Sequence, residues 1–304
     1  MHDVCYRARP DFYTDPRGRL SAAWHCLQYR RIAKRAERII TVSEFSKSEI
    51  AKYYGVPASK MDVVYNAWQQ MQRIAPDESI FARHPQLKPG QYYFSMANLL
   101  KNKNFPWVLR AAGAKPDAVF AIAGGGSLAA EAERLGLADL PNVLYLGYVS
   151  DGAAKALMAH CKAFLFPTLY EGFGIPPLEA AACGAPQIIV SDTPCMREVY
   201  GPCAAYIDLI ANPGDVDDVT PATAPTAALL EKYSWDKSAE RLLQNSRKIK
   251  HCPPLSTRKR RAVFYIPNFL SNVLYCSVSD RCAVSSTSLP SRSATVRATR
   301  RMRS

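Results

Sequence analysis

The chain has 304 residues, 48% of them hydrophobic, and carries a formal net charge of +13. This length and composition are typical of a globular protein with room for two domains. Its longest apolar runs are shorter than the ~18 residues of a membrane span, and its polar start predicts no secretory signal. The nine cysteines include no Cys-x-x-Cys pair, which argues against a disulfide framework and a structural zinc site.

The positive charge is concentrated in the last fifth of the chain. Residues 247–304 hold 13 of the 39 lysines and arginines but only one acid, Asp280, so residues 1–246 carry 26 bases and 25 acids. Because the body is nearly neutral, we expect no specific nucleic-acid partner. We predict that 247–304, rich in serine, arginine and proline, is a basic, disordered tail. Contact of its basic run 258–261 with nucleic acid or anionic lipid stays an open alternative.

The first elements alternate between helix and strand. Apolar spacing predicts a helix over 20–38, followed by short strands at 39–42 and 61–66. Between the strands, Ser43 is a good N-cap and Gly55 a good C-terminal residue for a helix over 44–54. The alternation begins in mid-pattern.

From residue 91 onward the alternation is regular. Continuous apolar runs predict six buried strands, at 92–97, 118–124, 142–149, 163–167, 187–190 and 204–208. Helical segments separate them, and two more, 226–233 and 235–245, close the pattern. Buried strands joined by helices predict an α/β fold with a parallel, doubly wound sheet covered on both faces.

The stretch "TLYEGFGIPPLEAAACGAPQIIVSD" (168–192) predicts a ligand site at the carboxyl edge of that sheet. Its glycines let backbone N–H groups approach a ligand, and Pro176 suits the start of a helix, whose N-terminus attracts phosphate. Glu171 precedes this helix and we expect Glu179 in its first turn, so one nucleotide-sugar could contact both. The alternative is an ordinary turn in which Glu179 only complements the helix dipole.

This stretch resembles the E-x7-E signature of the retaining family 4 glycosyltransferases, which have the GT-B fold. Three other stretches resemble the same family in the same order: "ITVSEFSKSEIAKYYGVPASKMDVVYNA" (40–67), "FSMANLLKNKNFPWVLRAA" (94–112) and "SDTPCMREVYGPCAAYID" (191–208). The resemblance covers roughly residues 1 to 246. It implies one complete Rossmann-like domain and part of a second one.

The resemblance also implies roles for individual residues. Glu171 matches the glutamate near the transferred sugar, and His2 matches the histidine of the catalytic cleft. Lys103 matches the lysine that neutralises the diphosphate, and Glu179 the glutamate that binds ribose. The remaining matches are backbone groups of Phe173 and Gly174 for sugar and phosphate, Val149 for the nucleobase, and Asn98 where many members have an arginine.

The activity implied is transfer of a sugar from a nucleoside-diphosphate-sugar to a sugar or lipid-linked acceptor, with retention of configuration and without cofactor or metal. The stretch "KNKNFPWVL" (101–109) is similar to bacterial polysaccharide mannosyltransferases, which favours GDP-mannose. We therefore expect a cytoplasmic enzyme of cell-surface polysaccharide or glycolipid synthesis. Peripheral association with the inner face of the membrane stays open.

The resemblance divides the chain into an acceptor-side remnant (1–70), a linker (71–90), the donor-binding domain (91–246) and the tail (247–304). Because the chain enters the first domain at about its last third, we expect its N-terminal stretch to be loosely packed and His2 poorly positioned. The alternative function is therefore a donor-binding remnant with little or no transferase activity.

Overall fold

The computed structural model describes residues 1–96, 98–247, 262–263 and 275–276. Most of the predicted tail therefore lies outside the described residues. The chain forms two compact units, 1–250 and 251–304. In the second unit, β9 (Ala262–Val263) pairs antiparallel with β10 (Tyr275–Cys276). All that follows concerns the first unit.

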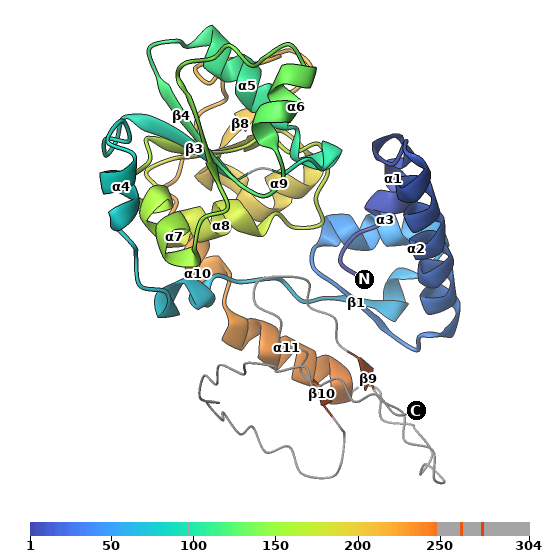
Figure 1. The fold of residues 1–304 in the computed structure, drawn as a ribbon. Coiled ribbons are helices and arrows are strands. Elements are labelled where there is room, and N and C mark those ends of the chain that lie inside the picture. The colour runs from blue at the N-terminus through green and yellow to red at the C-terminus, as the bar shows by residue number, and fades with distance from the viewer. Residues whose placement is uncertain (97, 248–261, 264–274, 277–304) are drawn as a thin grey trace, which may run out of the picture. The chain divides into compact units, whose positions relative to one another are not determined.

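A six-stranded parallel sheet forms the centre of this unit (Figure 1). Its strands are β3 (Tyr92–Met96), β4 (Val119–Ala123), β5 (Val143–Gly147), β6 (Ala163–Phe166), β7 (Ile188–Ser191) and β8 (Ala205–Ile207), in the order β5-β4-β3-β6-β7-β8. Within the sheet, the chain runs from β3 through β4 to β5 at one edge. It then crosses back to β6, on the other side of β3, and continues through β7 to β8 at the other edge. This is the doubly wound arrangement that the sequence predicts.

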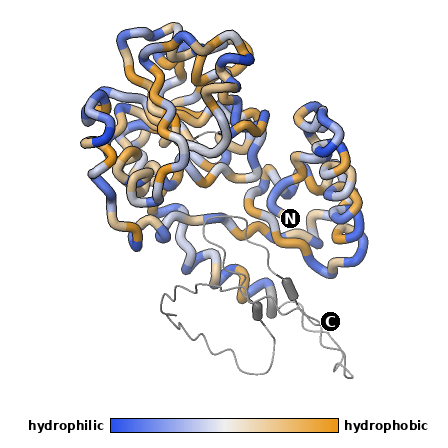
Figure 2. The backbone as a smooth tube through the Cα atoms, viewed as in Figure 1, coloured by the Kyte–Doolittle hydropathy of each residue, from blue (hydrophilic) through white to orange (hydrophobic). Residues whose placement is uncertain are grey.

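Helices cover both faces of the sheet. They are α4 (Ser79–Arg83), α5 (Phe105–Ala114), α6 (Leu128–Arg134), α7 (Asp151–His160), α8 (Ile175–Ala182) and α9 (Pro194–Tyr200). Helix α10 (Ala228–Lys232) packs against α8, and α11 (Trp235–Arg247) follows it in the chain. The neighbouring residues Tyr93 and Phe94 show the two-sided burial, because they belong to different apolar clusters and both are at most 3% exposed. In Figure 2, orange stretches, which mark hydrophobic residues, run through the region of this sheet. No helix in the described ranges is long and apolar enough to cross a membrane.

The N-terminal segment, residues 1–63, has its own small core. It comprises α1 (Cys5–Ala8), α2 (Pro16–Arg35), β1 (Ile39–Thr41), α3 (Glu44–Tyr54) and β2 (Met61–Val63), and β1 pairs parallel with β2. Val4 is fully buried in this core, and the Met1 ammonium donates a hydrogen bond to Ile40 O at 2.9 Å. The expectation of a loosely packed N-terminal stretch is therefore wrong for these residues.

Helix α3 begins and ends where the sequence predicts. Ser43 is its N-cap, with Oγ accepting from Ser46 N–H at 2.9 Å, and Gly55 ends it with a φ of +64°. The Ser43 hydroxyl also donates to Gly172 O at 2.6 Å, and Ser46 Oγ donates to the same oxygen at 3.1 Å. Both contacts are buried, so the first turn of α3 is held against the loop between β6 and α8.

We expect Ser43→Ala to destabilise the protein more than Ser150→Ala, although both remove a serine N-cap. Ser150 is exposed and caps α7 by accepting from Ala153 N–H, a contact worth about 1 kcal/mol. Ser43→Ala also removes the buried bond to Gly172 O, which adds about 1 kcal/mol. Urea unfolding measures both variants, and equal losses of unfolding free energy would contradict this role of the Gly172 contact.

Candidate functional site

The site lies at the carboxyl edge of the sheet, where the loops after β3 and β6 meet. β3 and β6 are adjacent strands, so the loop carrying Lys103 lies beside the loop carrying Glu171. Leu169 N–H donates to Asn102 O at 2.7 Å and fixes the two loops together. Helix α8 follows the second loop, with its prolines in the first turn as predicted.

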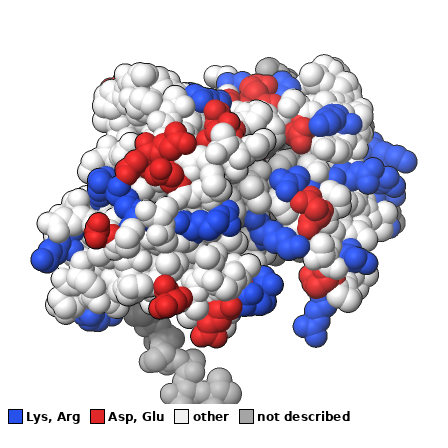
Figure 3. Space-filling view, turned by 90° about the horizontal axis from the view of Figure 1, so that it is seen from above, with Lys and Arg blue, Asp and Glu red and all other residues white. Residues whose placement is uncertain are grey.

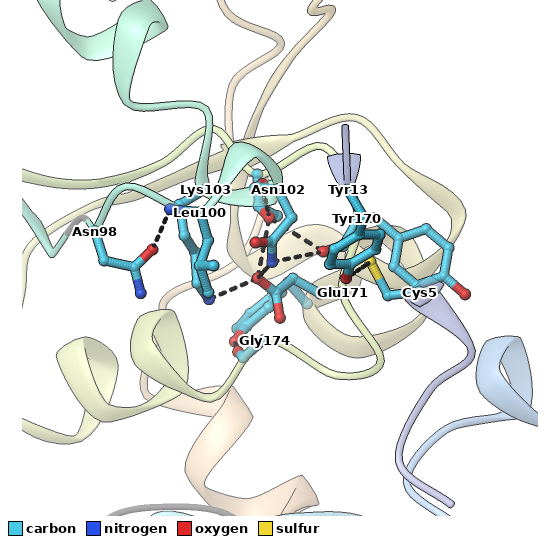
Figure 4. Close-up of polar contacts among 11 residues, drawn as sticks. Cys5, Tyr13, Asn98, Leu100, Asn102, Lys103, Tyr170, Glu171 and Gly174 are labelled. Atoms are coloured by element: carbon cyan, nitrogen blue, oxygen red, sulfur yellow. Dashed lines mark hydrogen bonds and ion pairs between the residues drawn. The ribbon is translucent and has the colours of Figure 1, made fainter. Parts of the chain in front are cut away.

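Lys103 and Glu171 form a partly buried ion pair (Figure 4). The lysine Nζ lies 2.7 Å from Glu171 Oε1 and 5.2 Å from the centre of the Phe166 ring. Thr168 Oγ1 and Asn102 Nδ2 donate to the same carboxylate oxygen, at 3.0 and 3.3 Å. The carboxylate is thus held in one position by three donors. Sequence reasoning missed Thr168 and Asn102, whose roles depend on two loops meeting.

The N-terminal segment approaches this loop at Gly172. A Cβ atom on Gly172 would lie 2.5 Å from His2 O and 3.0 Å from Asp3 Cβ, so only glycine fits there. The backbone of His2 therefore lies against Gly172, the residue that follows Glu171. Burial raises the pKa of Asp3, and the nearby Glu171 carboxylate raises it further. Asp3 was missed as a site residue, although the His-Asp pair in the sequence was a signal for it.

Glu179 is the fifth residue of α8, and the expectation that it lies in the first turn is wrong. The helix begins at Ile175, so Pro176 and Pro177 occupy its first turn. The Glu179 carboxylate is buried and accepts from Gln70 Nε2 at 2.9 Å, while Gln70 Oε1 accepts from Trp235 Nε1 at 2.8 Å. Burial raises the pKa of Glu179, and Gln70 partly opposes this effect. At this depth in the helix, complementing the dipole explains little of its position.

Phe173, Gly174 and Val149 are placed by packing. The Phe173 ring is buried against Tyr65 and Tyr233, so only its backbone is available to a ligand. Gly174 has a φ of +82°, and its carbonyl accepts a hydrogen bond from the Tyr200 hydroxyl. Val149 packs, partly buried, against the same core cluster as Phe173.

The Asn98 side chain makes a hydrogen bond within its own loop, because its Oδ1 accepts from Leu100 N–H at 3.0 Å (Figure 4). Lys101 bonds to the N-terminal segment, at Asp11 O and Thr14 Oγ1. A pocket of about 470 Å³ lies here, lined by Arg9, Asp11, Phe12, Asn98, Leu99, Leu100, Lys101, Asn104, Phe105, Pro106, Glu131, Arg134, Leu135 and Leu169. In the part of the chain that the structure describes, Asn98 is the one predicted site residue that lines this pocket.

These groups can bind an anion and several hydroxyls. Lysine carries three N–H donors and forms one contact here with Glu171, so two remain for an acceptor such as phosphate. Lys103, Thr168 and Asn102 all contact Glu171 Oε1, so none of these three donors uses the second oxygen, Oε2. A carboxylate oxygen in this state suits a sugar hydroxyl.

Comparison with known proteins gives matches along nearly the whole first unit. A family model described as "Glycosyl transferases group 1" matches residues 77–249, and one described as "Glycosyltransferase Family 4" matches residues 2–68. The O-antigen chain mannosyltransferase RfbU of Salmonella typhimurium is 28% identical over 220 residues, which cover 71% of this chain and 56% of the relative. The O-antigen chain mannosyltransferase B of Escherichia coli is 26% identical over 280 residues, covering 78% and 66%.

Among solved structures, Alr3699/HepE of Anabaena in complex with UDP-glucose superposes with a TM-score of 0.60 at 19% identity, covering 82% of this chain and 71% of that one. This likeness confirms the predicted α/β fold of the GT-B type. The chain spans between about half and two thirds of the length of the two mannosyltransferases.

The buried state of Glu179 predicts a pH-dependent stability. Because burial raises its pKa above the usual 4.5, the folded state keeps this proton to a higher pH than the unfolded chain. Its contribution to stability is full below pH 4.5 and is lost as the pH rises through the folded-state pKa, by about 1.4 kcal/mol for each pH unit between the two. Glu179→Gln keeps an acceptor for Gln70 without the charge, so we expect it to melt above the wild type at neutral pH.

Thermal unfolding monitored by circular dichroism across the pH range checks this. Below about pH 4.5 the Glu179→Gln and wild-type melting temperatures should converge. The matched control is Glu133→Gln on the exposed face of α6, which should follow the wild type throughout. A lower melting temperature for Glu179→Gln at neutral pH would show that the charged carboxylate stabilises the fold.

Proposed function

We propose that this chain, which belongs to the glycosyl transferases group 1 family, transfers mannose from GDP-mannose to a hydroxyl of a sugar or lipid-linked acceptor. The observation that carries the proposal is the Lys103–Glu171 pair at the carboxyl edge of the sheet, with the buried Glu179 on the helix that follows. The choice of mannose is supported by the relatives, two of which are O-antigen chain mannosyltransferases. Cell-surface polysaccharide synthesis is the corresponding setting.

The diphosphate of the donor would bind at Lys103. Its ammonium is held over the Phe166 ring and against Glu171, so the positive charge is already in position before the donor arrives. The N-terminus of α8, with Gly174 as its N-cap residue, faces the same edge and favours an anion. Since Asn98 is neutral and bonded to its own loop, the charge complementarity rests on Lys103.

The two glutamates would bind hydroxyls of the donor. Glu171 would accept from a hydroxyl of the mannose through Oε2, because Oε1 already contacts Lys103, Thr168 and Asn102. Glu179 would accept from the ribose diol through the oxygen that Gln70 does not use. Val149 would contact the guanine ring. In this arrangement one extended ligand would contact both carboxylates, with its mannose at Glu171 and its ribose at Glu179.

In the reaction, the bond between mannose C1 and the diphosphate oxygen breaks, and GDP leaves with both bonding electrons. The acceptor oxygen bonds to C1 on the same face, which retains the configuration, and the hydroxyl proton passes to the departing phosphate oxygen. Lys103 stabilises the charge that develops on the diphosphate, and His2 would orient the acceptor. Positioning and leaving-group stabilisation provide the rate enhancement.

Transfer and hydrolysis assays with GDP-mannose and UDP-glucose test the proposal. We expect mannose release from GDP-mannose, and transfer to octyl α-mannoside giving an α-linked product by NMR. Glu171→Gln should abolish both while leaving the far-UV spectrum unchanged. Binding of GDP without turnover of any donor would instead favour a donor-binding protein with little or no transferase activity.

Lys103→Met should weaken GDP binding by roughly tenfold or more and leave guanosine binding unchanged. A hydrogen bond to a charged group contributes about 1.5–3 kcal/mol, and only the phosphates are within reach of this ammonium. Isothermal titration calorimetry with both ligands measures the difference. Lys101→Met is the matched control, because Lys101 bonds to the N-terminal segment. Equal losses for GDP and guanosine would contradict the assignment of Lys103.

A further inference from the structure

Helix α2 carries a line of exposed apolar side chains. The helix has 20 residues and no buried one. Leu20, Trp24 and Leu27 are 74%, 57% and 47% exposed. Their spacing of four and three residues places them on one face of the helix. A tryptophan and two leucines in contact with water along one face indicate a surface that binds a partner.

The opposite face of α2 is the one that packs on the protein. The His25 ring stacks on Tyr6 with centroids 4.1 Å apart, and Tyr29 meets Tyr54 edge-on at 6.1 Å. Lys60 Nζ donates to Ala33 O at 3.1 Å. The apolar line is therefore additional to the face that holds the helix to the N-terminal segment.

Basic residues surround this line. Arg17, Arg19, Arg30, Arg31, Lys34 and Arg35 are all exposed, and the helix contains no acid. Within the described residues none of these six cations lies within ion-pair distance of a carboxylate. Arg31 continues the line one turn after Leu27. Figure 3 shows Lys and Arg atoms along the right-hand edge, the side on which α2 lies in Figure 1.

We propose that this outer face of α2 binds an anionic lipid surface, with the helix lying in the plane of the interface. An apolar row with tryptophan, bordered by lysine and arginine, is the composition of helices that insert one face into the headgroup region. Each nearby cation adds attraction to anionic headgroups. The proposal does not depend on the transfer reaction.

Charge argues against the other occupants of this face. A second copy of the chain would bring six cations against six, which opposes association. A nucleic acid would attract the cations, but its phosphates would gain nothing from Leu20, Trp24 and Leu27, which would stay in water. A lipid surface satisfies both the apolar row and the bases.

Trp24 itself is the probe for the test. Full-length protein is titrated with vesicles of phosphatidylcholine alone or mixed with phosphatidylglycerol. With the mixed vesicles we expect a blue shift of tryptophan emission and quenching by brominated acyl chains. Both signals should be absent in Trp24→Phe. The shift should also weaken in about 1 M salt, where the Debye length falls to about 3 Å.

Two variants test the two halves of the face. Leu20→Ser with Leu27→Ser, and separately Arg31→Ser with Lys34→Ser and Arg35→Ser, should each lower the vesicle partition coefficient at least tenfold. Ile210→Ser, which replaces an apolar side chain that is 97% exposed in the loop after β8, is the matched control and should bind like the wild type. Unchanged GDP binding by every variant shows that the fold is intact.

Other outcomes would overturn the proposal. Co-sedimentation with vesicles while Trp24 emission stays unshifted would place membrane binding elsewhere in the chain. A dimer in sedimentation velocity that Leu20→Ser with Leu27→Ser dissociates would assign this face to a second copy.

Loss of mannose transfer with vesicle binding intact would contradict the proposed function but leave this inference unaffected.

Discussion

The carbonyl oxygen of Gly172 joins the N-terminal segment, residues 1–63, to the loop between β6 and α8. It accepts hydrogen bonds from Ser43 and Ser46, while the absence of a side chain on Gly172 lets the backbone of His2 pass within contact distance. The two residues beside Gly172 have different surroundings. Glu171 forms an ion pair with Lys103, whereas Phe173 packs in the hydrophobic core. One turn thus positions the charged pair, a core residue and the N-terminal segment together.

A second contact reinforces this junction. The Glu198 carboxylate, on α9, accepts from the backbone N–H groups of Glu44 and Phe45 at 2.8 and 2.7 Å. These are N–H groups of the first turn of α3, which have no partner within their own helix, and a carboxylate there also complements the helix dipole. Because α3 is held from both the β6–α8 loop and α9, its orientation relative to the sheet is set by groups that leave little room for rotation.

The sequence was most informative where structure depends on neighbouring residues. Buried apolar runs predict all six strands, and Ser43 and Gly55 mark the ends of α3, because capping and burial are local properties. The bond from Gln70 to Glu179 links residues 109 apart, and no local pattern indicates it. The resemblance named Asn98 as a site residue but did not indicate its bond to Leu100 N–H, because a resemblance compares positions and not side-chain contacts. The position of Glu179 was misjudged because the helix begins one residue before the prolines.

Hydrogen–deuterium exchange of Gly172→Ala tests the central role of this turn most directly. The added Cβ would meet the backbone oxygen of His2, which cannot move without displacing the N-terminal segment. The account predicts faster exchange in residues 1–9 and in α3, with the sheet strands unchanged. Gly125→Ala, where a Cβ meets nothing within 4 Å, is the control and should exchange like the wild type. Unchanged protection of α3 in Gly172→Ala would contradict the account.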